Sequence, residues 1–179
     1  MKLKLLILST LFITLGSCTK IVMVIYGIKQ PEYTSNEEVV SYANKVLDYK
    51  GDILRISSYT GEEDIPFDIT TLPTIRIMDS STIYEFETSC TGDIDSKMEL
   101  LNLDEEKLRV VRDYKRDEWG ERLNSIKEEN IATPEKMTVA IFYANYLGKL
   151  NKNHVDKWIE SISLNNEVPF VLINCDLSE

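Results

Sequence analysis

The amino-acid sequence predicts an α/β protein with a central mixed sheet flanked by helices. Two observations carry this prediction. Residues 21–56 alternate between an apolar run, an amphipathic stretch and a second apolar run, which is the order of a strand–helix–strand unit. Residues 137–174 repeat that order near the end of the sequence. With 43% hydrophobic residues, the 179-residue chain can bury the core of one domain or of two small ones.

The first unit begins with a β-branched run at residues 21–26, which predicts a strand buried on both faces. Ser35 and Glu38 have the spacing of a capping box, so a helix is expected to begin after Ser35. Gly51 is expected to end this helix, and residues 52–56 are predicted to form the second strand.

The remaining strands are predicted from short apolar runs between polar turns. Residues 75–78 and 82–88 are expected to form an antiparallel hairpin. Residues 137–143 and 168–174 are expected to be strands, with a helix capped by Asn153 between them.

The N-terminus has the pattern of a secretory signal. Lys2 and Lys4 open an apolar segment, and Leu-Gly-Ser stands directly before Cys18. This ending resembles the lipobox of bacterial lipoproteins. The resemblance implies that residues 1–17 are removed and that Cys18 becomes the first residue and carries the lipid. We therefore expect an envelope lipoprotein that is anchored to a membrane and faces the periplasm or the cell surface.

A transmembrane anchor is the alternative for the same segment. Residues 5–28 are mostly apolar, but Thr19 and Lys20 interrupt them, and spanning a bilayer takes about 20 consecutive apolar residues.

The charge balance excludes some partners. The formal net charge is −10, and it becomes −12 when removal of residues 1–17 takes away Lys2 and Lys4. A chain this acidic does not bind nucleic acid by neutralising phosphates, and anionic lipid head groups repel it.

The remaining cysteines and the histidine give no metal motif. Cys90 and Cys175 are far apart in the sequence, and His154 is the only histidine, so neither a zinc site nor another metal site is predicted. An exported protein permits a disulfide between Cys90 and Cys175, and two separate buried thiols are the alternative.

The step Leu72-Pro73-Thr74 precedes the predicted hairpin. Together with the strand–helix–strand unit before it and a helix led by Gly92 after it, this step resembles the thioredoxin fold. The resemblance implies a cis bond before Pro73. It also implies that the strand edge beside Leu72, Pro73 and Thr74 pairs with an extended client peptide.

A second likeness lies in residues 142–150, which read Phe-Tyr-Ala-Asn-Tyr-Leu-Gly-Lys-Leu. They resemble Phe-Trp-Ala-x-Trp-Cys-Gly-Pro-Cys, the active segment of thioredoxins and of the thioredoxin-like reductases of bacterial envelopes. Leu147 and Leu150 occupy the two cysteine positions of this motif. In the first unit, Gln30 and Tyr33 occupy the corresponding two positions. Because disulfide exchange needs a reactive thiolate and a second thiol that resolves the mixed disulfide, we expect no dithiol chemistry.

These likenesses divide the chain into a signal peptide (1–17), a thioredoxin-like domain without CxxC (18–103), a helical connector (104–134) and a partial thioredoxin-like unit (135–179). The connector is predicted because its sequence is charge-rich with a thin apolar stripe. The last unit lacks a proline-led hairpin of its own. Either it is truncated, or residues 137–179 add a strand–helix–strand flank to the first domain.

The expected function is that of a lipid-anchored, redox-inactive binding or scaffold module without a cofactor, whose partner is an extended peptide or an envelope protein. One alternative is a thiol-disulfide oxidoreductase that uses Cys90 and Cys175, or thiols in a missing C-terminal part. The other is a structural lipoprotein subunit of a larger envelope assembly.

Overall fold

A computed structural model of the chain describes residues 23–56, 72–79, 82–85, 109–113, 123–126, 137–164 and 169–178. The elements within them are β1 (Tyr33–Thr34), α2 (Asn36–Val46), β2 (Ile53–Ile56), β3 (Thr74–Met78), β4 (Thr82–Glu85), β5 (Arg109–Asp113), β6 (Leu123–Ser125), β7 (Thr138–Tyr143), the 3-10 turn η5 (Asn145–Leu147), α5 (Lys149–Leu164), β8 (Phe170–Asn174) and β9 (Leu177–Ser178).

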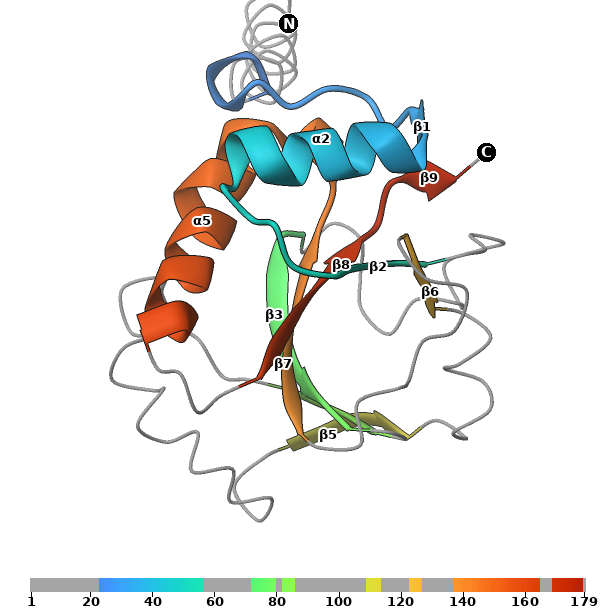
Figure 1. Ribbon diagram of the computed structural model, residues 1–179, viewed down its shortest axis with the longest axis vertical. Coiled ribbons are helices and arrows are strands. Elements are labelled where there is room, and N and C mark those ends of the chain that lie inside the picture. Colours follow the sequence, from blue (N-terminus) through green and yellow to red (C-terminus); the bar gives the residue numbers. More distant parts are fainter. Residues whose placement is uncertain are drawn as a thin grey trace, which may run out of the picture.

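A mixed sheet forms the centre of the molecule, as the α/β prediction requires. In the described part of the chain its order is β5-β4-β3-β7-β8-β2-β6. β7 and β8 are parallel and are joined through η5 and α5, and β8 is also parallel to β2. The other pairs of neighbours in this sheet are antiparallel. A small parallel pair, β1 with β9, lies beside the N-terminal end of α2 (Figure 1).

The topology brings the two expected thioredoxin-like stretches into one sheet. β7 and β8, from the last part of the chain, lie between β3 and β2, from the first part. The last part is therefore not a separate sheet unit. The topology agrees with the alternative in which residues 137–179 add strands to the first domain, except that these strands insert into its sheet rather than flank it.

The central strands are buried on both faces, and successive side chains enter two different hydrophobic clusters, as the pleat of a strand requires. Along β7, Val139, Ile141 and Tyr143 enter the cluster covered by α2 and α5. Ala140 and Phe142 enter the cluster on the opposite face. Full burial of a large apolar side chain stabilises a fold by about 1.5–3 kcal/mol. This burial fixes the end of β7, where the candidate site begins.

Helix α2 begins as its sequence predicts. The Ser35 hydroxyl accepts a bond from the Glu38 amide, and the Glu38 carboxylate accepts one from the Ser35 amide, which completes the capping box. The helix ends earlier than expected, however. Leu47 is its C-cap and Asp48 adopts a positive φ of 46°, so the chain leaves the helix before it reaches Gly51.

The expected first strand is wrong. Residues 21 and 22 lie outside the described part, and Met23–Tyr26 is a helical turn in which Val24 is 79% exposed and Ile25 is 58% exposed. A short apolar run is compatible with a strand or a helix, and periodicity alone does not distinguish them. The parallel strand–helix–strand unit is instead made by β7, α5 and β8.

The expected helical connector is also wrong where the structure describes it. Residues 104–134 contain β5 and β6, which pair with β4 and β2. Asn153 is not a cap, because α5 already begins at Lys149. The connector was misjudged because the partner strands that make β5 and β6 extended lie far away in the sequence.

Candidate functional site

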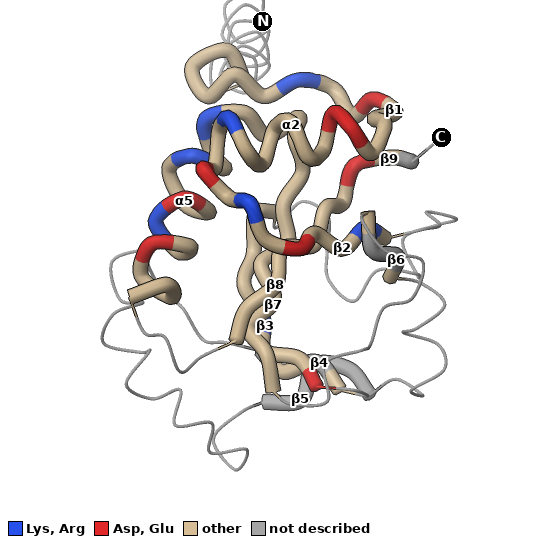
Figure 2. The backbone as a smooth tube through the Cα atoms, in the orientation of Figure 1, with Lys and Arg blue, Asp and Glu red and all other residues tan. Residues whose placement is uncertain are grey.

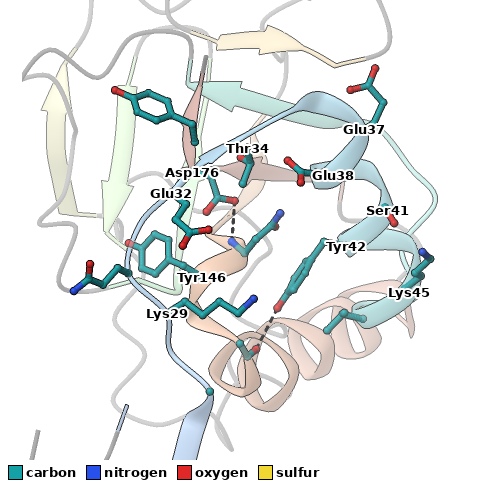
Figure 3. A pocket seen from close by; sticks show the side chains of 16 residues that line it. Lys29, Glu32, Thr34, Glu37, Glu38, Ser41, Tyr42, Lys45, Tyr146 and Asp176 are labelled. Carbon is teal, nitrogen blue, oxygen red and sulfur yellow. Dashed lines mark hydrogen bonds between the residues drawn. The ribbon is translucent and has the colours of Figure 1, made fainter. Parts of the chain in front are cut away.

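A cleft of about 680 Å³ lies beside the C-terminal ends of β7 and β8. Its walls come from segment 27–34, from α2, from the turn at residues 145–148 and from Asp176 just after β8. In Figure 3, Lys29, Glu32, Tyr42 and Asp176 surround the same opening. The cleft is therefore built from parts of the chain that are distant in sequence.

Asp176 is the most enclosed charged group of the cleft, with 2% of its surface exposed. Its carboxylate oxygen Oδ2 accepts bonds of 2.8 Å from the Asn145 amide and from Asn174 Nδ2. The Asp176 amide donates to Asn174 Oδ1 at 3.2 Å. These contacts fix the carboxylate at the start of the turn that leads into α5.

Burial raises the pKa of Asp176 above its ordinary value of 3.8. The hydrogen bonds from Asn145, Asn174 and Tyr146 and the charge of Arg55 act in the opposite direction. Burial also raises the pKa of Tyr146 to about 12, with help from Cys175 and Asp176, and it raises the pKa of Tyr42. Both phenols therefore stay protonated at neutral pH and face the cleft as neutral hydrogen-bonding groups.

Tyr42 joins α2 to the turn before α5. Its hydroxyl donates to the Gly148 carbonyl oxygen at 3.2 Å and accepts from Asn151 Nδ2 at 3.0 Å. Asn151 also donates to the Ala144 carbonyl oxygen at 2.7 Å. The Tyr42 ring stacks on the ring of Tyr143, with centroids 6.3 Å apart. One wall of the cleft is thereby held against the end of β7.

The turn at residues 145–148 is also covered by the segment before β1. The Lys29 amide donates to the Tyr146 carbonyl oxygen at 2.8 Å. Gly148 has φ 54° and ψ −120°, and a Cβ atom there would lie 2.5 Å from the Gly27 carbonyl oxygen. Glycine is therefore required both by the backbone angles and by the close approach of the two segments.

Arg55 ties this end of the molecule together from inside β2, where it is 5% exposed. Its guanidinium donates to Asn36 Oδ1, to the carbonyl and hydroxyl oxygens of Thr34, and to the Leu177 carbonyl oxygen, at 2.6–2.9 Å. A planar guanidinium can bridge several acceptors at once. The charged residue thus positions β1, β9 and the start of α2 around the cleft.

The cleft has an acidic end and a basic end. Glu32, Glu37 and Asp176 lie toward β1 and β9, whereas Lys45 lies at the other end of α2 (Figure 2). Tyr33 is 67% exposed at the acidic end. Lys29 lies beside Glu32 and Tyr146 (Figure 3), so the acidic end also holds one ammonium group, and Lys45 provides the other.

Leu147 and Leu150, which were expected at two cysteine positions of the thioredoxin resemblance, are apolar and covered. Leu147 is buried in the cluster that contains Leu72, Ala144 and Cys175, and the half-buried Leu150 packs against this cluster. Cys175 is a free thiol with 2% of its surface exposed, and burial, followed by the charge of Asp176, raises its pKa. Cys175 is therefore a protonated core residue, and its expected disulfide partner Cys90 lies outside the described residues.

Gln30 and Tyr33 do not repeat this arrangement, because the described residues before them, Met23–Tyr26, form a helical turn and not a strand. Both are exposed and line the cleft, opposite the turn that contains Tyr146. The structure thus brings both sets of expected positions to one end of the molecule, but only Leu147 and Leu150 occupy the start of a helix that follows a central strand.

The expected peptide-binding edge lies at the start of β3. The bond between Leu72 and Pro73 is cis, as predicted. However, β3 is paired on both sides, with β4 and β7, and Thr74 lies opposite Phe142 in the register. Leu72 and Thr74 are buried, at 6% and 7% exposure. The described pairs between β3 and β4 run only from Arg76 to Met78, so the β4 side of Thr74 has no strand opposite it among the described residues. The expected edge stays a prediction, and the cleft is a second candidate surface for binding.

Two expected site residues, Cys18 and Cys90, lie outside the described residues. Sequence reasoning missed the roles of Asp176, Tyr42 and Arg55. One signal for Arg55 was available: a charged residue inside the otherwise apolar run 53–56 has to find buried acceptors.

Comparisons with protein families, with curated proteins and with solved structures find no match to this chain. No helix within the described ranges combines the length and the apolar character needed to cross a membrane. The same residues contain no group of three or more His, Cys, Asp or Glu side chains arranged to hold a metal ion.

Proposed function

We propose that the chain is a lipid-anchored, redox-inactive envelope protein of thioredoxin-like architecture, which binds a segment of a partner protein in the cleft above the turn at residues 145–148. The observation that carries the proposal is the position of the cleft. It lies over the start of α5, where the resembled family places its dithiol, and this chain has Leu147 and Leu150 there.

The sheet supports the thioredoxin-like part of the proposal. A parallel pair joined through a helix, β7-α5-β8, lies next to a hairpin, β3-β4, whose leading strand is antiparallel to β7. These are the parts that the resemblance names. In this chain the hairpin precedes the strand–helix–strand unit in the sequence, and the two meet in space.

The groups in the cleft suit a polypeptide partner. Tyrosine side chains such as Tyr33 and Tyr146 provide flat apolar area with a polar tip, which is typical of protein-binding surfaces. Glu32 and Glu37 favour a partner segment with a basic side chain, whereas Lys45 at the other end favours an acidic group or a carboxyl terminus. We therefore expect an extended segment with a basic side chain beside Glu32 and Glu37 and an acidic group beside Lys45.

Site-specific photocrosslinking tests the proposal. p-Benzoylphenylalanine is placed at Tyr33 in the cleft or at Leu164, which is 81% exposed at the far end of α5. The expected result in intact cells is a discrete crosslinked product from position 33 and none from position 164. Introducing Glu32→Lys and Glu37→Lys should abolish the product, because these exposed substitutions reverse the charge of the cleft.

The other outcomes separate the alternatives. Products of equal yield from both positions would indicate a subunit enclosed by a larger assembly and would contradict binding in the cleft. A product at position 33 that survives both charge reversals would contradict the proposed recognition of a basic segment.

A further inference from the structure

The chain exposes an apolar turn directly before the cleft segment. Residues 23–28 contain no charged side chain, although 28% of the whole chain is charged. Within this turn Val24 is 79% exposed and Ile25 is 58% exposed. Scattered exposed apolar residues are normal on a protein surface, whereas contiguous exposed apolar residues are a feature of surfaces that bind apolar partners.

The turn is fixed to the body of the protein, so its exposed side chains have a defined direction. The Gly27 amide donates to the Val24 carbonyl oxygen at 3.2 Å, and the Ile28 amide donates to the Met23 carbonyl oxygen at 2.8 Å. The next residue, Lys29, bonds to the turn before α5. Met23, Tyr26 and Ile28 are half-buried, which leaves Val24 and Ile25 as the outward pair.

We infer that this turn is a membrane-docking surface, in which Val24 and Ile25 enter the boundary between head groups and acyl chains of the bilayer that holds the lipid anchor. The inference rests on the proposed lipidation of Cys18. Val24 follows Cys18 by six positions, which is about 20 Å of chain even when fully extended. The anchor therefore keeps the turn next to the head groups.

Two apolar side chains alone would bind a membrane weakly, but the anchor changes the equilibrium. A tether this short makes docking an intramolecular event with an effective concentration on the order of millimolar. Charge selects the same face: without residues 1–17 the net charge is −12, so anionic head groups repel most of the surface but not this uncharged turn. Tyr26 belongs to the residue type enriched at membrane interfaces.

Docking would fix where the cleft opens. The residues immediately after the turn, from Gly27 to Glu32, form one wall of the cleft. In Figure 1 the turn and the β1–β9 pair both lie at the top of the view, and α5 runs downward on the left, so that its C-terminal end lies away from them. The partner segment would thus be held beside the bilayer, which favours a partner that is itself at the membrane.

Fluorescence quenching tests the inference on the full lipidated chain. The variants Val24→Trp and Leu164→Trp place a probe at two exposed positions, at 79% and 81% exposure, and are reconstituted in phosphatidylcholine vesicles with brominated acyl chains. The contributions of Trp119 and Trp158 are subtracted with the parent chain. The added emission at position 24 should fall about twofold, because an interfacial residue lies about 5–10 Å into the head-group boundary. The emission at position 164 should not change.

Flotation of the vesicles separates this inference from the proposal beneath it. If the chain floats with the vesicles but the two probes are quenched equally, or the probe at position 24 is not quenched, the docking surface is refuted and the anchor stands. If the parent chain does not float with the vesicles and carries no acyl chains, the anchor is refuted and the inference falls with it.

Discussion

At the scale of single residues, the cleft depends on groups that are charged or polar and yet enclosed. Asp176 and Arg55 are both almost fully buried, and each is held by several hydrogen bonds to backbone or side-chain partners. Enclosing a charge costs free energy that such bonds only partly return. Asp176 lines the cleft and Arg55 holds β1, β9 and the start of α2 around it, so both mark a place where position matters more than stability.

The raised pKa of Asp176 predicts a specific pH dependence of stability. Because the folded chain holds this proton more tightly than the unfolded chain does, protonation stabilises the fold below the ordinary pKa of 3.8, and the stabilisation is lost as pH rises through the raised value. Relative to Asp176→Asn, the natural chain should therefore lose unfolding free energy between pH 4 and pH 7.

Urea denaturation of both chains across that pH range measures the difference in unfolding free energy. Subtracting one chain from the other cancels the contributions of the other carboxylates. A difference that is constant with pH, or that changes in favour of the natural chain as pH rises, would contradict the role of burial at Asp176.

At the scale of elements, the sequence predicted those whose signal is local. The capping box of Ser35 and Glu38 placed the start of α2, and apolar runs placed β2, β7 and β8 within a few residues. The run at residues 21–26 failed, because an apolar run becomes a strand only where neighbouring strands are available to pair with it. β5 and β6 were missed for the reverse reason. Pairing with β4 and β2 makes these segments extended, although their charge-rich sequences do not predict strands.

The contact between segment 23–29 and the turn before α5 predicts different effects of two glycine substitutions. Gly27→Ala meets only an unfavourable φ of 64°, with no atom within 4 Å of the new Cβ, and should cost about 1 kcal/mol. Gly148→Ala adds a clash with the backbone of Tyr26 and Gly27 and should cost about 3 kcal/mol.

Urea denaturation followed by Trp fluorescence provides both unfolding free energies. Equal costs for the two substitutions would show that the segment does not press on the turn.

At the scale of the whole molecule, the α/β class was predictable and the sheet order was not. Local periodicity identifies strands, but it does not say which strands become neighbours, and the insertion of β7 and β8 between β2 and β3 is a long-range choice. The cleft follows from that choice. Lys29, Tyr42, Tyr146 and Asp176 are spread over most of the chain, and no local pattern joins them.

The anchoring of the whole molecule is predicted to depend on one thiol. Cys18→Ser should move the protein from the membrane fraction to the soluble fraction, because stable attachment then lacks its acyl chains and one apolar turn holds the chain only weakly. Cell fractionation with mass spectrometry of the N-terminal peptide measures both location and acyl mass. The membrane fraction should retain a Cys90→Ser control. Full retention of Cys18→Ser, with no acyl mass on the natural chain, would refute the lipoprotein assignment.

The central claim is that a thioredoxin-like architecture has lost its redox chemistry and kept a binding cleft. Insulin reduction by the purified full-length chain in dithiothreitol tests it most directly. Because Leu147 and Leu150 occupy the start of α5, and burial raises the pKa of the Cys175 thiol, the rate should equal that of a control without protein. A clear increase in rate that disappears in Cys175→Ser or Cys90→Ser would contradict the claim and identify the protein as an enzyme.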